Sequence, residues 1–157
     1  MQTSNVIIVG AGPTGLMLAN QLTRFGIDYI IIDQKAGPTD QFRALVVHAK
    51  SMEIYQQLGL SAQILANGQP NDGLMFYKKG KLVTSLTLTN PGENLTPFPF
   101  MMMYEQSKNE TLLYNNLKAQ NKEVQWNTHI DAIEKTDGGY TIKANSKMKQ
   151  YIFTAST

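Results

Sequence analysis

Residues 6–33 read VIIVGAGPTGLMLANQLTRFGIDYIIID, and this stretch decides the fold that the sequence predicts. Its two β-branched runs, Val6–Val9 and Tyr29–Ile32, have the continuous apolar pattern of strands buried on both faces of a parallel sheet. Between them, Pro13 suits a first helical turn and Gly26 suits a C-terminal stop, so the intervening residues predict a helix. The stretch therefore predicts a Rossmann-like strand–helix–strand unit of the α/β class.

The loop between the first strand and the helix carries the GxGxxG pattern of dinucleotide-binding proteins. In that pattern the first glycine permits a sharp turn, the second leaves room for a pyrophosphate, and the third lets the helix pack closely on the strand. The phosphates then meet N–H groups at the positive end of the helix. An aspartate that ends the second strand is placed to accept hydrogen bonds from both ribose hydroxyls. The candidate cofactor-binding residues of this stretch are Gly10, Ala11, Gly12, Pro13, Thr14, Gly15 and Asp33.

The same glycines allow a plainer interpretation, in which they only make a tight connection between a strand and a helix. Glycine is favoured at turns for backbone reasons alone. An acidic residue at Asp33 is not needed for turning, however, so its presence favours the nucleotide site over the purely structural interpretation.

Two further helices are predicted before the middle of the chain. Met52, Tyr55 and Leu58 mark one face of a helix, and Ser61 can cap a short helix that reaches Asn67. After them, Leu74–Tyr77 and Leu82–Leu88 are strand-like runs about a Lys-Lys-Gly-Lys turn, which predicts a hairpin. Prolines and a glycine between residues 90 and 99 break any regular element. We therefore expect residues 70–104 to form a small β-rich insertion.

The last third of the chain predicts one helix followed by strands. Ser107 and Glu110 have the spacing of a capping box, and leucines behind them supply the buried face of a helix to about Gln120. The strands predicted after this helix cover residues 124–128, 130–135, 140–144 and 150–154. We expect one of these tail strands to join the parallel sheet of the first 33 residues.

Composition excludes several classes of function. The 157 residues carry a formal charge of +2 and show no basic stripe of the kind that nucleic-acid binding needs, so no nucleic-acid partner is expected. The chain has no cysteine, which excludes disulfides and thiolate chemistry, and no metal site can be assembled from its two histidines. No run approaches the ~18 apolar residues of a membrane span. The sequence therefore predicts a cytoplasmic protein without a membrane partner.

Three segments extend the glycine motif into a family resemblance. They are Gln41–Ala49 (QFRALVVHA), Glu53–Leu60 (EIYQQLGL) and Glu105–Ser107 (EQS). With residues 6–33, they resemble the aromatic-ring hydroxylases of the p-hydroxybenzoate hydroxylase type, the group A flavin monooxygenases. The resemblance runs along essentially the whole chain, which is similar to the FAD-binding N-terminal portion of such an enzyme.

The resemblance implies a cofactor, a reaction and two further site residues. The cofactor is FAD, NADPH or NADH is the transient reductant, and the substrate in the full-length family is a small phenol-like aromatic molecule. Arg43 matches the family arginine beside the flavin and its pyrophosphate, and Gln106 matches the family glutamine that hydrogen-bonds the cofactor. The plainer interpretation of Arg43 is a surface arginine, and that of Gln106 is a loop residue before a helix. No catalytic residue is assigned.

One departure from the family pattern concerns the end of the sequence. Residues Tyr151–Thr157 (YIFTAST) lie where the family has a strand running into Gly-Ala-Asp-Gly, the second cofactor motif. We therefore expect an FAD-binding domain over residues 1–157 that is either a truncated or rearranged gene product or a cut piece of a longer protein, and that does not hydroxylate on its own.

Two other functions remain open from the sequence. A non-catalytic nucleotide-binding or interaction module would keep the ADP site alone. An NAD-dependent dehydrogenase would also use Asp33, because a carboxylate disfavours the 2′-phosphate of NADP. The predicted hairpin argues against the dehydrogenase, since such a chain more often continues in regular βαβ alternation.

Overall fold

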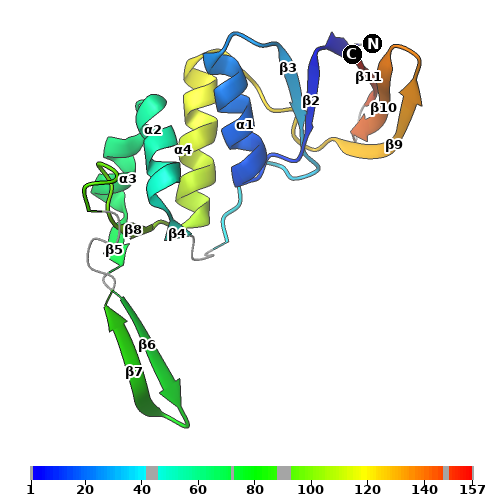
Figure 1. The fold of residues 1–157 in the computed structure, drawn as a ribbon. Helices are drawn as coiled ribbons and strands as arrows, with labels where there is room; N and C mark the ends of the chain where they lie inside the picture. The colour runs from blue at the N-terminus through cyan, green and yellow to red at the C-terminus, as the bar shows by residue number, and fades with distance from the viewer. Residues whose placement is uncertain (1, 42–45, 72, 88–92, 147–148, 157) are drawn as a thin grey trace. The chain divides into compact units, whose positions relative to one another are not determined.

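A computed structural model describes the backbone of residues 2–41, 46–71, 73–87, 93–146 and 149–156. The chain divides into two compact units, one formed by Met1–Gln41 with Ser107–Thr157 and the other by Phe42–Gln106. Each unit is coloured by residue number in Figure 1. Within the described part of the chain, no helix is long and apolar enough to cross a membrane.

The first unit contains the predicted strand–helix–strand motif. Strands β2 (Val6–Val9) and β3 (Tyr29–Ile32) pair in parallel, and helix α1 (Pro13–Arg24) connects them (Figure 1). The predicted α/β fold class is thereby confirmed. The expectation of full burial on both faces is wrong for the end of β2, because Val9 is 55% exposed and lines a pocket.

The tail of the chain forms a second sheet in the first unit. Its order is β1-β11-β10-β9, with β1 parallel to β11 and the other neighbours antiparallel. The bounds are β1 (Gln2–Ser4), β9 (His129–Thr136), β10 (Gly139–Ser146) and β11 (Lys149–Ser156). Three predicted tail strands are thus confirmed, whereas β1 was not predicted. Its three residues are too few to show an alternating pattern.

The predicted strand at residues 124–128 is wrong. The segment makes one isolated parallel bridge, between Gln125 and Ile32, and otherwise turns. The expectation that a tail strand joins the parallel sheet is also wrong, because β2 and β3 form a separate two-stranded sheet and the tail meets it at this isolated bridge. The two sheets share one core, in which Ile32 packs with Ile142, Ala144 and Phe153.

The second unit contains two helices, a small sheet and a hairpin. Helices α2 (Ala49–Gln57) and α3 (Ser61–Asn67) are present as predicted, although the N-cap of α3 is Leu60 and not Ser61. The antiparallel sheet has the order β4-β8-β5. Strands β6 and β7 pair separately as the predicted hairpin. The strand bounds are β4 (Val46–Val47), β5 (Gln69–Asn71), β6 (Gly73–Lys78), β7 (Lys81–Thr87) and β8 (Met101–Met103).

Helix α4 (Gln106–Ala119) confirms the predicted helix but not its predicted start. The helix begins at Gln106, so Ser107 lies inside it and not at its cap. The carboxylate of Glu110 binds Lys35 and Thr39, which lie in the segment that follows β3. The capping box is therefore corrected, because tertiary contacts recruit the glutamate that local spacing assigned to the cap.

Candidate nucleotide-binding site

The glycine loop has a backbone that side chains would obstruct. Gly10 has a φ of +99°, in the region that favours glycine. A Cβ on Gly15 would stand 1.9 Å from the Gly10 carbonyl oxygen, so only glycine fits there. At Gly12 the closest atom to such a Cβ is Glu110 Oε1, at 4.0 Å. The missing Gly12 side chain therefore leaves open space along the loop.

Helix α1 begins directly at this loop. Gly12 is its N-cap and makes no side-chain cap hydrogen bond, and Pro13 occupies the first turn. The first intrahelical bond runs from the Leu16 N–H to the Gly12 carbonyl, over 2.9 Å. The N–H groups of a first helical turn have no intrahelical acceptor and favour a negatively charged ligand. The loop has the shape and the polarity that a diphosphate needs.

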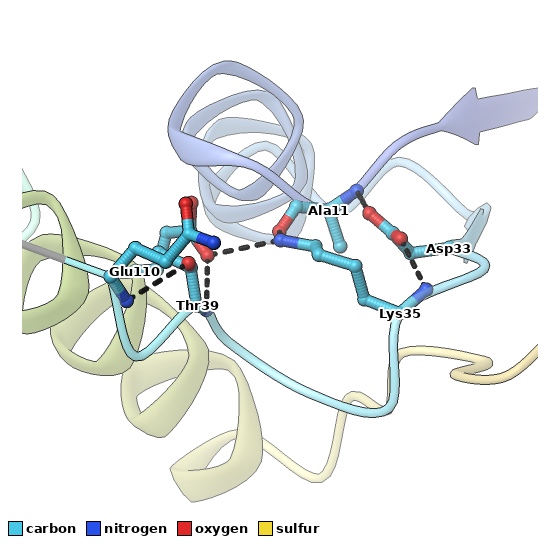
Figure 2. A network of polar contacts seen from close by, with 6 residues as sticks. Ala11, Asp33, Lys35, Thr39 and Glu110 are labelled. Atoms are coloured by element: carbon cyan, nitrogen blue, oxygen red, sulfur yellow. Dashed lines mark hydrogen bonds and ion pairs between the residues drawn. The ribbon is translucent and has the colours of Figure 1, made fainter. Parts of the chain in front are cut away.

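Asp33 connects the end of β3 to the glycine loop. Its Oδ2 accepts the Ala11 N–H over 2.6 Å, and its Oδ1 accepts the Lys35 N–H over 2.7 Å (Figure 2). The Gly10 N–H donates to the Ile32 carbonyl over 2.8 Å in the same region. Two carboxylate oxygens offer about four acceptor positions. Asp33 can therefore shape the loop and still accept hydrogen bonds from a ligand.

A pocket of about 310 Å³ opens beside Asp33. It lies at the carboxyl ends of β2 and β3, the edge at which open parallel sheets bind ligands. Its lining residues are Val9, Gly10, Ile32, Asp33, Gln34, Thr128, His129 and Ile130. Sequence reasoning found two of these residues, Gly10 and Asp33.

The tail residues of the pocket carry no local signal of binding. They reach the pocket because the Asp33 N–H donates to the Gln125 carbonyl over 3.1 Å and the Thr128 N–H donates to the Asp33 carbonyl over 2.9 Å. These are backbone contacts across more than ninety positions of sequence. Only the expectation that a tail segment joins the first sheet pointed toward them.

A partly buried ion pair lies next to the glycine loop. Glu110 is 1% exposed, and its Oε2 accepts the Lys35 Nζ over 3.1 Å and the Thr39 N–H over 2.7 Å (Figure 2). The Lys35 ammonium also lies 3.5 Å from the Ala11 carbonyl oxygen. The pair therefore joins α4, the segment after β3 and the glycine loop within one unit. Sequence reasoning did not assign Lys35 to the site.

The structure does not test two of the predicted site residues. Arg43 lies outside the described residues. Gln106 is the first residue of α4 and belongs to the second unit. Their cofactor contacts stay predictions. Among the described residues, no group of three or more histidine, aspartate or glutamate side chains could hold a metal ion.

The described residues fit the ADP end of a dinucleotide. They offer a glycine cradle that a Cβ at Gly15 would distort, a helix start without a side-chain cap, and a carboxylate beside a pocket. The arrangement can bind and orient a nucleotide, whereas redox chemistry would come from the cofactor.

Known proteins are similar to this chain in both sequence and fold. A model of the family described as FAD binding domain matches residues 3–155. The relatives include 6-methylpretetramide 4-monooxygenase of Streptomyces rimosus, 34% identical over 80% of this chain and 22% of that protein. Pentachlorophenol 4-monooxygenase of Sphingobium chlorophenolicum is 30% identical over 92% of this chain and 26% of that protein.

Solved structures give the same result for the fold. The p-nitrophenol 4-monooxygenase from Pseudomonas putida DLL-E4 superimposes with a TM-score of 0.88 at 21% identity, over 99% of this chain and 40% of that one. An anhydrotetracycline hydroxylase from Streptomyces rimosus gives a TM-score of 0.82 at 26% identity, over 99% of this chain and 30% of that one.

The comparisons confirm the resemblance to flavin-dependent aromatic hydroxylases. The chain spans about a quarter of the length of the two curated relatives named above, 22% and 26%. The match favours FAD over the cofactor of a dehydrogenase, because the whole of residues 3–155 follows the FAD family. The chain therefore belongs to the FAD binding domain family, and its relatives are FAD-dependent monooxygenases.

Proposed function

We propose that this chain binds the ADP half of FAD, as the FAD-binding portion of an NAD(P)H-dependent monooxygenase that hydroxylates small aromatic molecules in the cytoplasm. The observation that carries the proposal is the glycine loop, in which Asp33 accepts the Ala11 N–H and Gly15 leaves no room for a Cβ. A loop held in this way presents the start of α1 to a diphosphate. The family match over residues 3–155 supports FAD as the ligand.

Each part of the site has a proposed share in binding. Residues 10–15 hold the diphosphate, Asp33 accepts the ribose hydroxyls, and the pocket lined by Gln34 and Thr128 receives the adenine. A bound flavin supplies the redox chemistry, with NADPH or NADH as reductant. The residues described here orient the cofactor by its adenosine end.

Further assignments follow from the resemblance. We propose that Arg43 contacts the flavin diphosphate, because a guanidinium matches the geometry of phosphate oxygens. Gln106 donates a hydrogen bond to the cofactor in the same proposal. Residues 1–157 then constitute one FAD-binding domain, with residues 70–104 as its β-rich insertion.

Calorimetric titration of the purified chain with FAD and with ADP tests the proposed function. If the chain holds FAD by its ADP half, the two ligands compete and their affinities differ by less than about tenfold, or roughly 1.4 kcal/mol. The control variant Asp28→Asn should bind both ligands like the parent chain, since Asp28 is an exposed residue whose ion pair with Lys122 is long, at 3.9 Å. A folded protein that binds neither ligand would contradict the proposal.

Turnover is a separate measurement. We expect no substrate-dependent NADPH oxidation by this chain with phenolic substrates, because the chain spans only about a quarter of the length of its relatives and flavin hydroxylation needs a site that excludes water. Oxidation of NADPH that depends on added phenol, with stoichiometric FAD, would show that this chain has the complete activity. Binding without turnover would fit the ADP-site proposal and would also describe a non-catalytic nucleotide-binding module.

A further inference from the structure

The buried carboxylate of Glu110 presents an electrostatic difficulty for the proposed site. Its side chain is 1% exposed, and its Oε1 lies 4.0 Å from the point where a Cβ of Gly12 would stand. A diphosphate that uses the space left by Gly12 would therefore approach a negative charge across the loop. In a buried environment such like-charge repulsion is screened only weakly.

Lys35 is placed to remove this repulsion. Its Nζ lies 3.1 Å from Glu110 Oε2 and 3.5 Å from the Ala11 carbonyl oxygen, so the ammonium sits against both the carboxylate and the loop. The side chain is 35% exposed and its Nζ lies 5.8 Å from the centre of the Trp126 ring. A cation held between Glu110 Oε2 and the Ala11 carbonyl compensates the charge of the carboxylate beside the loop (Figure 2).

We propose that Lys35 is a positioning residue of the nucleotide site, whose charge compensates Glu110 so that the glycine loop accepts the diphosphate of an adenine nucleotide. The proposal rests on the proposed function, namely that the loop binds a diphosphate. Lys35 acts through Glu110 and the loop, and it is not a catalytic residue.

A second contact makes the proposal testable by mutation. Glu110 Oε2 also accepts the Thr39 N–H over 2.7 Å, so removal of Lys35 leaves the carboxylate held close to the loop. Lys35→Met therefore leaves a buried negative charge next to the diphosphate. The adenosine part of the ligand carries no charge and does not meet this repulsion, whereas a purely structural role for Lys35 would affect both ligands.

The experiment compares the binding of ADP and adenosine by calorimetry or competition. In Lys35→Met the ADP affinity falls at least about tenfold while the adenosine affinity stays within about twofold. Lys35→Arg keeps the charge, and the double variant Lys35→Met with Glu110→Gln removes both charges, so both bind ADP within about threefold of the parent chain. Lys143→Met is the matched control, because Lys143 makes an exposed pair with Glu134 on the tail sheet.

Equal losses for ADP and adenosine in Lys35→Met, or no loss for either ligand, would overturn the proposal. If Lys35→Met does not fold, Glu110→Gln tests the proposal instead, because it removes the negative charge of Glu110 and keeps the positive charge of Lys35. It should bind ADP at least as tightly as the parent chain, and a tenfold loss would contradict the compensation. Failure of the parent chain to bind ADP would instead refute the proposed function, so the two failures are distinguishable.

Discussion

The strand–helix–strand motif and the β6–β7 hairpin are both rich in apolar residues, but only the motif buries some of them completely. Leu16, Ile31 and Ile32 are at most 1% exposed, whereas Met75 is 68% and Val83 63% exposed. The hairpin has the pairing that its sequence predicts, yet a two-stranded hairpin has no second layer on which to bury side chains. Apolar pattern therefore specifies the type of an element, and long-range packing decides whether it is buried.

The polar groups differ between the two regions in the same way. In the first unit, Asp33 accepts the N–H of Ala11, which lies in the glycine loop, and Glu110 binds Lys35, which lies after β3. The hairpin is closed locally by Lys79 and Gly80, whose φ values of +49° and +76° define a type I′ turn. The hairpin is determined by neighbouring residues, whereas the nucleotide site depends on segments that are distant in sequence. Mutations should affect the two regions very differently.

Gly15→Ala should have the largest effect. Its Cβ would lie 1.9 Å from the Gly10 oxygen, so the loop must shift. We expect a loss of more than about 3 kcal/mol of unfolding free energy, beyond the usual range of overpacking, and no measurable ADP binding. Urea unfolding followed by Trp126 fluorescence reports on this unit. Gly37→Ala is the control, because no atom lies within 4 Å of its Cβ position, and an equal loss there would contradict the steric argument.

A matched pair of leucine truncations tests the comparison directly. Leu16 is fully buried in α1 and Leu82 is 56% exposed in β7. Leu16→Ala should reduce the unfolding free energy by about 3 kcal/mol, the middle of the range for buried leucines. Leu82→Ala should change it by less than about 0.5 kcal/mol. Urea midpoints from circular dichroism measure both, and similar losses at the two sites would show that the hairpin is packed in solution.

Asp33→Asn should have an intermediate effect, mainly on binding. The amide keeps one acceptor oxygen but places a donor opposite either the Ala11 or the Lys35 N–H. We expect ADP affinity to fall by roughly 1–3 kcal/mol, the scale of a lost hydrogen bond to a charged group. Calorimetry with ADP is the measurement, and Asp28→Asn again serves as control. Unchanged affinity in a folded Asp33→Asn chain would place the ribose contact elsewhere.

The sequence predicts the glycine loop and Asp33 because their signals are local. Gly10, Gly15 and Asp33 lie within one strand–helix–strand unit, so spacing alone relates them. The structure shows the backbone constraints behind that spacing, whereas their contacts with FAD are a proposal. The hairpin was predicted for the same reason, since its turn residues adjoin its strands.

Other parts of the site could not be predicted from local pattern. Glu110 has the spacing of a capping box with Ser107, but its carboxylate binds Lys35 and Thr39, which lie more than seventy positions earlier. Likewise, Thr128 was assigned to a strand and instead turns beside Asp33. In both cases a tertiary hydrogen bond to the segment after β3 overrides the local preference.

The smallest predicted effect concerns Tyr29 at alkaline pH. Burial raises the pKa of the Tyr29 phenol above 10.0, and the hydrogen bond with Thr23, 2.8 Å between the oxygens, opposes this only in part. Because the pKa in the folded state exceeds that in the unfolded state, this contribution to stability is complete below pH 10 and is lost as the pH rises through the folded pKa. Tyr29→Phe removes the ionisation, so its urea midpoint should fall less steeply above pH 10 than that of the parent chain. The urea midpoints are followed by the fluorescence of Trp126, which lies in the first unit. Tyr77→Phe, in the second unit, should therefore keep the parent slope. Identical slopes for the parent and Tyr29→Phe would show that the Tyr29 phenol is as well solvated in the folded chain as in the unfolded one.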